Sequence, residues 1–331
     1  MRIREEVGKY IQRLQQLAQA IATVDVLQSL ASVAESQQLN RPLFHEERRI
    51  AIDKGRHPVV EKVMGAQSYI PNSIFMDEER DIQLITGPNM SGKSTYMRQL
   101  EIIVILAQIG SYVPAQKAEL PIFDAIYTRI GAADDLVSGQ STFMVEMNEV
   151  ADILKRATYN SLLVLDGIGR GTSTFDGMSI ARAVLEYVHD KKLVGAKTMF
   201  ATHYHELTAL EDQLPGVKNF NIAVKKRGDD ITFLRRIVRG GADDSFGVEV
   251  AKLAGGPDKV IRRAKQVLAE LEETGGEGLR PTHRRFSEEP VQLTMDTVDG
   301  EVLQKLRNLD VNSLTPIQCM NTLFELCSML K

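Results

Sequence analysis

The residues with the clearest capacity for chemistry form a glycine-rich loop at residues 87–95. The loop matches the pattern G-x-x-x-x-G-K-[ST] and lies between an apolar strand-like segment and a helix-like segment. Glycines let backbone N–H groups turn inward onto phosphate oxygens, and the N-terminus of the following helix adds its positive dipole end. Lys93 would bind the β- and γ-phosphates, and Ser94 would bind Mg²⁺. The predicted nucleotide-binding residues are Gly87, Pro88, Asn89, Met90, Ser91, Gly92, Lys93, Ser94 and Thr95.

A second segment, Leu162–Asp166, is an apolar strand that ends in a carboxylate. A carboxylate at the end of a buried strand is costly unless it is paired. If Asp166 faces Ser94, it can complete Mg²⁺ coordination through water. The alternative is an Asp that caps a turn or a helix. Together with the loop, the metal-binding interpretation is favoured, with Ser94 and Asp166 as the metal residues.

Strand-like and helix-like segments alternate along the middle of the chain, which is typical of an α/β fold with a mainly parallel sheet. Two short segments upstream, Val59–Met64 and Ser68–Asn72, are expected to be β-like. The expected strands are Ile82–Thr86, Ser161–Asp166 and Lys197–Thr202, followed by a hairpin over Asn219–Val238; the expected helices are Lys93–Ile109, Phe143–Ala157 and Met178–Asp190.

The flanks of the α/β region are helical. Residues 3–36 show apolar side chains at three- and four-residue spacing, and residues 248–273 predict two helices joined by a Gly-Gly turn. Residues 274–300 have the composition of a flexible linker. Residues 301–331 recover helical periodicity but are too few to build a core, which suggests self-association.

The composition is that of an ordinary globular protein: 331 residues, 43% apolar and 25% charged, with a net charge of −4. The acidic average excludes a surface that binds polyanions throughout. Cys319 and Cys327 are about 12 Å apart along a helix, too far to form a disulfide within it, so we expect a reduced cytoplasmic protein. No apolar run approaches the roughly 18 residues of a membrane span, and no signal peptide is visible. The chain looks like part of a longer one.

Several longer strings resemble the MutS family of bacterial DNA mismatch-repair ATPases. The resemblance runs from about residue 8 to residue 272 and returns at Leu314. The strings that carry it are Thr86–Gln99, Gly55–Glu61, Ile130–Asp135, Ser141–Met147, Gly169–Gly177 and Ala201–Leu207.

This resemblance implies a P-loop NTPase of the ABC-ATPase type that works as a head-to-tail homodimer with ATP, ADP and Mg²⁺. Tyr69 would stack on adenine, although an exposed turn tyrosine is the plain alternative. Ser141 would reach the partner's γ-phosphate and can also be a simple N-cap. His203 would be the switch residue near the γ-phosphate, and Gly169–Thr172 would lie across the dimer.

The resemblance also implies a domain order and partners. Mismatched DNA would be bound by a part of the longer protein, a MutL-type repair protein would be a partner, and the protein would be cytoplasmic and nucleoid-associated. Residues 301–331 would pair dimers into tetramers. Gln292–Met295 loosely resembles a sliding-clamp-binding peptide, although a solvated linker is the favoured interpretation of these four residues. The expected parts are 1–45, the end of the lever-arm helices; 46–247, the ATPase domain; 248–273, a dimerisation segment; 274–300, the linker; and 301–331, the self-association module.

One departure from the family pattern concerns catalysis. Asp166 is followed by Gly167, where the family has a Glu that orients or deprotonates the attacking water. General-base assistance contributes about 10²–10⁴ in rate, so we expect ATP binding with slow hydrolysis. His203 or Asp135 could partly substitute. A smaller departure is Asp244, where the family commonly has Lys.

Three functions follow in order of support. The first is the ATPase module of a mismatch-repair protein, in which the nucleotide state switches a dimer that controls the grip on DNA. The second is an ATP-binding dimerisation switch with little hydrolysis, favoured by Gly167. The third is an ABC ATPase of transport or chromosome organisation. Val137–Thr142 argues against the third, since it departs from the Leu-Ser-Gly-Gly-Gln signature of transporters.

Overall fold

The computed structural model describes residues 2–65, 68–88, 91–131, 141–227, 230–241, 246–273, 315, 317–318 and 320–322. The chain divides into two compact units, Met1–Gln266 and Val267–Lys331. All strands described below belong to the first unit. The expected mixed α/β class is confirmed, whereas the predicted domain boundaries remain predictions.

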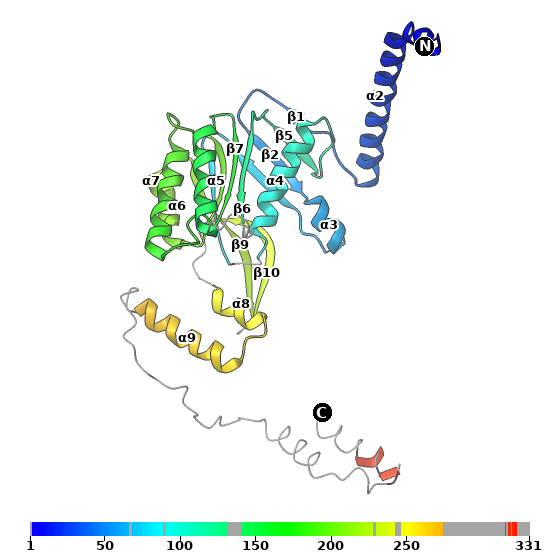
Figure 1. Cartoon of the computed structure of the whole chain (residues 1–331). Helices are drawn as coiled ribbons and strands as arrows, with labels where there is room; N and C mark the ends of the chain where they lie inside the picture. The colour runs from blue at the N-terminus through cyan, green and yellow to red at the C-terminus, as the bar shows by residue number, and fades with distance from the viewer. Residues whose placement is uncertain are drawn as a thin grey trace. The chain divides into compact units, whose positions relative to one another are not determined.

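A six-stranded sheet forms the centre of the first unit (Figure 1). Its order is β10-β9-β4-β8-β7-β6, and every neighbouring pair is parallel except the β9–β10 hairpin. Parallel strands put their carboxyl ends at one edge, so the loops that follow four different strands meet there. The strands are β4 (Ile82–Thr86), β6 (Ile126–Ile130), β7 (Leu162–Asp166), β8 (Lys197–Ala201), β9 (Val217–Arg227) and β10 (Asp230–Arg239).

The central strands are buried on both faces, as a sheet covered on two sides requires. Successive side chains of a strand point to opposite faces. In β7, Leu162 and Val164 join the apolar cluster around α4 (Lys93–Gln108), whereas Leu163 and Leu165 join the cluster of α5 (Thr142–Arg156) and α6 (Thr174–His189). The near-continuous apolar sequence of this strand therefore serves two separate cores.

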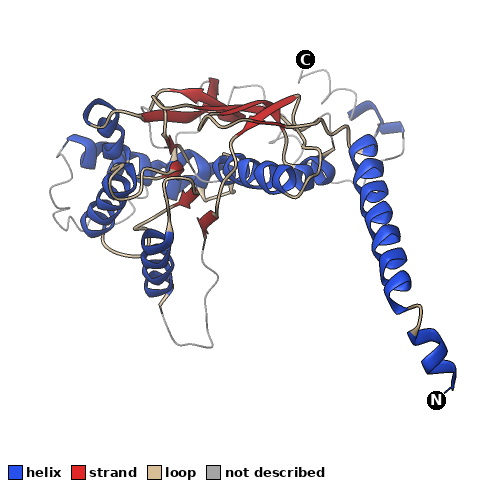
Figure 2. Ribbon diagram, turned by 90° about the horizontal axis from the view of Figure 1, so that it is seen from above, coloured by secondary structure: helices blue, strands red, loops and turns tan. Residues whose placement is uncertain are grey.

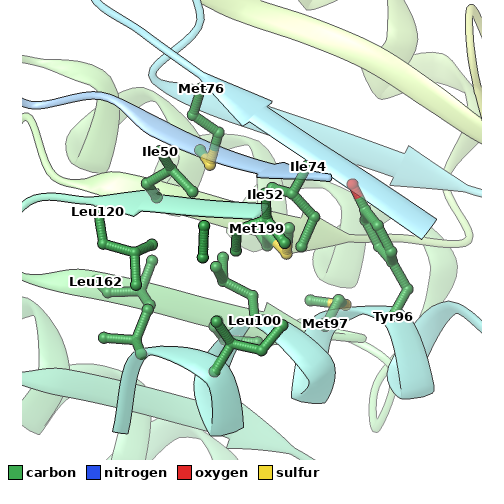
Figure 3. Packing of buried hydrophobic residues seen from close by; sticks show 14 of the residues in the cluster. Ile50, Ile52, Ile74, Met76, Tyr96, Met97, Leu100, Leu120, Leu162 and Met199 are labelled. Atoms are coloured by element: carbon green, nitrogen blue, oxygen red, sulfur yellow. The ribbon is translucent and has the colours of Figure 1, made fainter. Parts of the chain in front are cut away.

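Helix α4 lies between the central sheet and a second, four-stranded sheet of order β1-β5-β2-β3. Met97 and Leu100 on the helix point toward the strands that carry Ile50, Ile52 and Ile74 (Figure 3). Apolar contacts on two sides hold the helix that begins at Lys93 in a defined position. The strands of this sheet are β1 (Leu43–Phe44), β2 (Ile50–Gly55), β3 (Asn72–Met76) and β5 (Lys117–Leu120).

The remaining described helices are short or terminal. Helix α1 and the 26-residue helix α2 precede the sheets and are separated by a short break at the N-terminal end (Figure 2). No residue of α2 is buried. The bounds are α1 (Arg2–Gly8), α2 (Ile11–Ser36), α3 (Pro58–Met64), the 3₁₀ helix η1 (His205–Ala209), α7 (Leu210–Gln213), α8 (Gly247–Leu253) and α9 (Asp258–Glu273).

Helix α2 corrects one expectation. Among the described residues it is the one helix long and apolar enough to cross a membrane by length and composition alone. The expectation that no segment reaches that size is wrong by this criterion. Its apolar residues recur every three or four positions, a pattern that also suits packing against another helix.

The segment Val59–Met64 is also different from the prediction, because it is the helix α3 and not a strand. Pro58 occupies the first turn, where its missing N–H costs nothing, and the His57 side chain accepts a hydrogen bond from the Val60 N–H at 3.4 Å. These start signals outweigh the β propensity of the valines. Similarly, Ser68–Pro71 lies outside any strand, and β3 begins at Asn72.

A buried ion pair at the amino-terminal edge of the central sheet generates a stability prediction. The Lys197 Nζ lies 2.6 Å from Asp81 Oδ1, and the side chains are 0% and 8% exposed. Removing one partner of a buried pair costs about 3–5 kcal/mol because it leaves an unpaired charge. We expect Asp81→Ala to lower the free energy of unfolding by about that amount, measured by urea denaturation.

The matched control is Glu186→Ala, which breaks the exposed Arg182–Glu186 pair on α6. Exposed pairs of this kind contribute about 0.3–0.5 kcal/mol. If both variants lose a similarly small amount of stability, the buried pair does not have the role assigned to it.

Candidate nucleotide site

A cavity of about 610 Å³ opens at the carboxyl edge of the central sheet. Residues that follow four parallel strands line it: Pro88 after β4, Gly131 after β6, Gly167 after β7 and His203 after β8. Because β8 lies between β4 and β7, His203 is placed between the glycine-rich loop and Asp166. The edge where parallel strands end is where ligands bind in open α/β sheets.

The described part of the glycine-rich loop combines two glycines of positive φ with the start of a helix. Gly87 and Gly92 have φ values of +131° and +109°, in a region that side chains disfavour. Helix α4 begins at Lys93, directly after Gly92. The Lys93 Nζ donates to the carbonyl oxygens of Gly87 and Pro88, at 2.8 Å for the latter. The lysine charge is thereby held at the mouth of the loop.

Ser94 and Asp166 lie side by side, 72 residues apart in the chain. The Ser94 hydroxyl donates to Asp166 Oδ2 at 2.6 Å, and both residues line the cavity. Hydroxyl and carboxylate oxygens are the ligands that Mg²⁺ prefers. No group of three or more His, Cys, Asp or Glu side chains suited to a metal occurs among the described residues. A metal here would therefore share its ligands between these two side chains, water and a bound phosphate.

The cavity is electrostatically positive around the loop. Burial lowers the pKa of Lys93 to about 8, with Asp166 opposing the shift and Arg170 adding to it. Burial lowers the pKa of His203 to about 4, and Lys93 and Arg170 lower it further while Asp166 opposes them. His203 is therefore neutral at pH 7 and can donate one hydrogen bond and accept another.

Gly167 lines the cavity in a backbone conformation that other residues adopt at a cost. Its φ is +75°, and its N–H donates to the Ala201 carbonyl at 3.0 Å. A Cβ at this position would lie 3.4 Å from the Arg170 Cδ. The position expected to carry a carboxylate therefore has a glycine in a left-handed turn, with the Arg170 side chain beside it.

Two predicted site residues lie at the borders of the cavity. The Tyr69 side chain lines a separate cavity of about 220 Å³, which shares Gly92 and Thr95 with the first. Its hydroxyl donates to Gln99 Oε1 at 3.1 Å and accepts from the His57 N–H at 3.0 Å. Ser141 is the N-cap of α5, where its Oγ accepts from the Met144 N–H at 3.2 Å.

Sequence reasoning missed Glu146, which is 6% exposed and lines the same cavity. It ion-pairs with Arg129 at 3.3 Å and accepts the Gly169 N–H at 2.7 Å. A signal existed, because Glu146 lies on the buried stripe of α5 with Val150 and Ile153. A carboxylate at an inward position of an amphipathic helix indicates a buried partner.

Several predicted features lie outside the described residues. They are Asn89, Met90, Asp135, the segment 137–140, Asp244, the linker 274–300 with Gln292–Met295, Cys319, Cys327, and most of the segment 301–331.

Comparison with known proteins identifies the family. The family model described as MutS domain V matches residues 83–272, more than half of the chain. The chain belongs to the MutS family. The match includes Lys93, Ser94, Asp166 and His203, so the cavity lies within the family domain.

Individual MutS family members are similar over nearly the whole chain. The DNA mismatch repair protein MutS of Streptococcus sanguinis (strain SK36) is 58% identical over 332 residues, and that of Streptococcus gordonii is 58% identical over 330 residues. Both alignments cover 98% of this chain and 39% of the relative. The corresponding protein of Streptococcus thermophilus (strain ATCC BAA-491 / LMD-9) is 55% identical over 335 residues, with the same coverage. The chain therefore spans about 39% of the length of these relatives.

The environment of His203 yields a titration prediction. We expect its NMR midpoint near pH 4, the value to which burial lowers its pKa. Because the unfolded chain binds this proton near pH 6.5, the neutral histidine stabilises the fold above pH 6.5, and this contribution is lost as the pH falls from 6.5 to about 4. Replacing Lys93 with Met removes a neighbouring positive charge and should raise the midpoint.

The control is Lys192→Met, which removes an exposed lysine that does not line the cavity. It should leave the His203 midpoint where it is. A midpoint near 6.5 in the parent chain would contradict the described burial of the imidazole.

Proposed function

We propose that this chain is the ATP-binding and ATPase module of a MutS-type DNA mismatch-repair protein. The observation that carries the proposal is the hydrogen bond between Ser94 and Asp166, next to the loop-bound Lys93 in one cavity. A hydroxyl, a carboxylate and a lysine in this arrangement suit a nucleoside triphosphate with Mg²⁺. The MutS domain V match supports an ATPase of this family.

The side chains of the cavity would have separate tasks. Loop N–H groups and Lys93 would bind the β- and γ-phosphates, and Tyr69 would contact the base from the adjoining cavity. Ser94 and Asp166 would hold Mg²⁺, which neutralises charge on the phosphates when it is bound. Neutral His203, between the loop and Asp166, would form a hydrogen bond near the γ-phosphate.

Hydrolysis in this cavity would be slow. Position 167 offers no base, and Arg170 beside it is a cation that cannot accept a proton from water. An ATP-binding dimerisation switch with little turnover is therefore the second candidate, favoured by Gly167. In either case ATP would join two copies head to tail in an ABC-type dimer, with Ser141 at the partner's nucleotide. Membership of the MutS family counts against a role in transport.

The partners remain part of the proposal. In a protein of the relatives' length, the nucleotide state of this module would control the grip on mismatched DNA and contact with a MutL-type protein, in the bacterial cytoplasm. Tetramers through 301–331, clamp binding through Gln292–Met295 and the domain boundaries predicted above belong to the same proposal.

Lys93 provides the first test of nucleotide binding. Hydrogen bonds to charged groups contribute about 1.5–3 kcal/mol, so Lys93→Ala should raise the Kd for Mg²⁺–ATP about 10- to 100-fold. Isothermal titration calorimetry measures this change. Lys62→Ala, in α3 and outside both cavities, should bind ATP like the parent chain. An unchanged Kd in Lys93→Ala would contradict the proposal that the loop binds the phosphates of ATP through Lys93.

Gly167 provides the test that separates the two candidate functions. Gly167→Glu and Gly167→Ala both place a Cβ at φ +75°, which costs roughly 1–2 kcal/mol, but only Glu supplies a carboxylate. We expect single-turnover hydrolysis about 10²–10⁴ faster in Gly167→Glu than in Gly167→Ala. Light scattering should show ATP-dependent dimers in the parent chain with slow turnover. Equal rates in the parent and in Gly167→Glu would argue for an active ATPase that uses another base.

A further inference from the structure

Both backbone polar groups of Gly169 form hydrogen bonds to side chains of other elements. Its N–H donates to Glu146 Oε1 at 2.7 Å, and its carbonyl accepts from the Tyr204 hydroxyl at 2.8 Å. Glu146 belongs to α5, and Tyr204 directly follows His203 after β8. The turn after β7 is thus bonded to the helix capped by Ser141 and to the segment that carries His203.

Gly169 and Gly171 in this turn, and Gly177 in α6 beside it, have no room for a side chain. A Cβ on Gly169, whose φ is +85°, would lie 2.2 Å from the Gly177 carbonyl oxygen in α6. A Cβ on Gly177 would lie 2.2 Å from the Tyr204 hydroxyl, and a Cβ on Gly171 would lie 2.9 Å from the Phe143 Cβ in α5. Because backbone packs directly on neighbouring elements, the turn has little freedom to shift without them.

Glu146 is suited to holding the turn rather than to accepting a proton. One carboxylate oxygen accepts the Gly169 N–H, and the other pairs with the Arg129 guanidinium, which is 4% exposed. Arg129 also pairs with Glu149 at 3.0 Å. Both oxygens of the Glu146 carboxylate are therefore engaged by protein groups, and we do not assign Glu146 the role of the carboxylate absent at Gly167.

We propose that Glu146 and Tyr204 are positioning residues that hold the backbone of Gly169 and, through it, orient the turn of residues 167–171 toward the phosphates. Arg170, on this turn, lines the cavity beside Gly167. Ser141 caps the same helix five residues before Glu146, so a displacement at the start of α5 would reach the turn through the Glu146–Gly169 hydrogen bond. This inference rests on the proposed function, since the phosphates are those of ATP.

The test compares Glu146→Ala, Glu146→Gln and Tyr204→Phe in the full chain, with Glu149→Ala as the matched control. Glu149→Ala removes the other carboxylate partner of Arg129 and leaves the Gly169 bonds intact. Three quantities are measured: the Kd for Mg²⁺–ATP, the single-turnover rate with radiolabelled ATP and protein in excess, and amide hydrogen exchange of residues 167–172 without nucleotide.

We expect Glu146→Ala and Tyr204→Phe to speed exchange of residues 167–172 and to slow single turnover about tenfold, with the Kd changed less than about threefold. Glu146→Gln keeps an amide oxygen for the Gly169 N–H and should retain most of the rate. Glu149→Ala should match the parent. Because both bonds hold the backbone of one residue, Gly169, the double variant Glu146→Ala/Tyr204→Phe should lose less than the product of the single losses.

The results that would overturn the inference are separate from those that would overturn the proposed function. If residues 167–172 exchange their amide hydrogens equally fast in Glu146→Ala and Glu149→Ala, Glu146 does not hold the turn, whether or not ATP binds. If exchange is faster in Glu146→Ala and Tyr204→Phe but the single-turnover rate is unchanged, the two side chains make a structural contact only. The proposed positioning role is then wrong. Failure of the parent chain to bind Mg²⁺–ATP overturns the proposed function. The exchange data still decide whether Glu146 and Tyr204 hold the turn.

Discussion

The parallel pairing of β6, β7, β8 and β4 is the constraint on which the site depends. Backbone ladders fix these strands side by side with their carboxyl ends at one edge. The residues that follow these strands therefore lie close together, and they form the cavity wall. The pairing is stabilised because β4, β7 and β8 are covered on both faces by apolar side chains. The positions of the cavity residues at the carboxyl edge of the central sheet therefore depend on the packing of its apolar core.

Helix α4 connects this core to the phosphate loop. It is packed on one side by the central sheet and on the other by the smaller sheet, so its first turn cannot drift. Lys93 and Ser94 occupy that turn and are positioned by contacts about one to three turns away, at Met97, Leu100 and Val104. Precision at the loop thus comes from burial of a helix, whereas the loop itself needs glycine backbone freedom to turn around phosphate.

The charges of the cavity favour binding over turnover. The cations Lys93, Arg98, Arg129 and Arg170 line it, against the carboxylates Asp166 and Glu146 among the described residues. Glu146 is already engaged by Arg129 and Gly169. A polyphosphate would be attracted by this balance, but a water molecule would find no free base at Gly167. This balance is the physical basis of the proposal that the cavity binds ATP but hydrolyses it slowly.

The sequence by itself determined the features that depend on near neighbours. The glycine turn before Lys93, the cap at Ser141 and the strand ending in Asp166 follow from residue types a few positions apart, and each lies where it was expected. Local patterns failed at Val59–Met64, where a proline and a histidine cap outweighed valine propensity. Two features could be read only from the tertiary structure. One is the strand order that places His203 between the loop and Asp166. The other is the hydrogen bond from the Gly169 N–H to Glu146, 23 residues away. Such contacts depend on how separate elements pack, and no local periodicity encodes that packing.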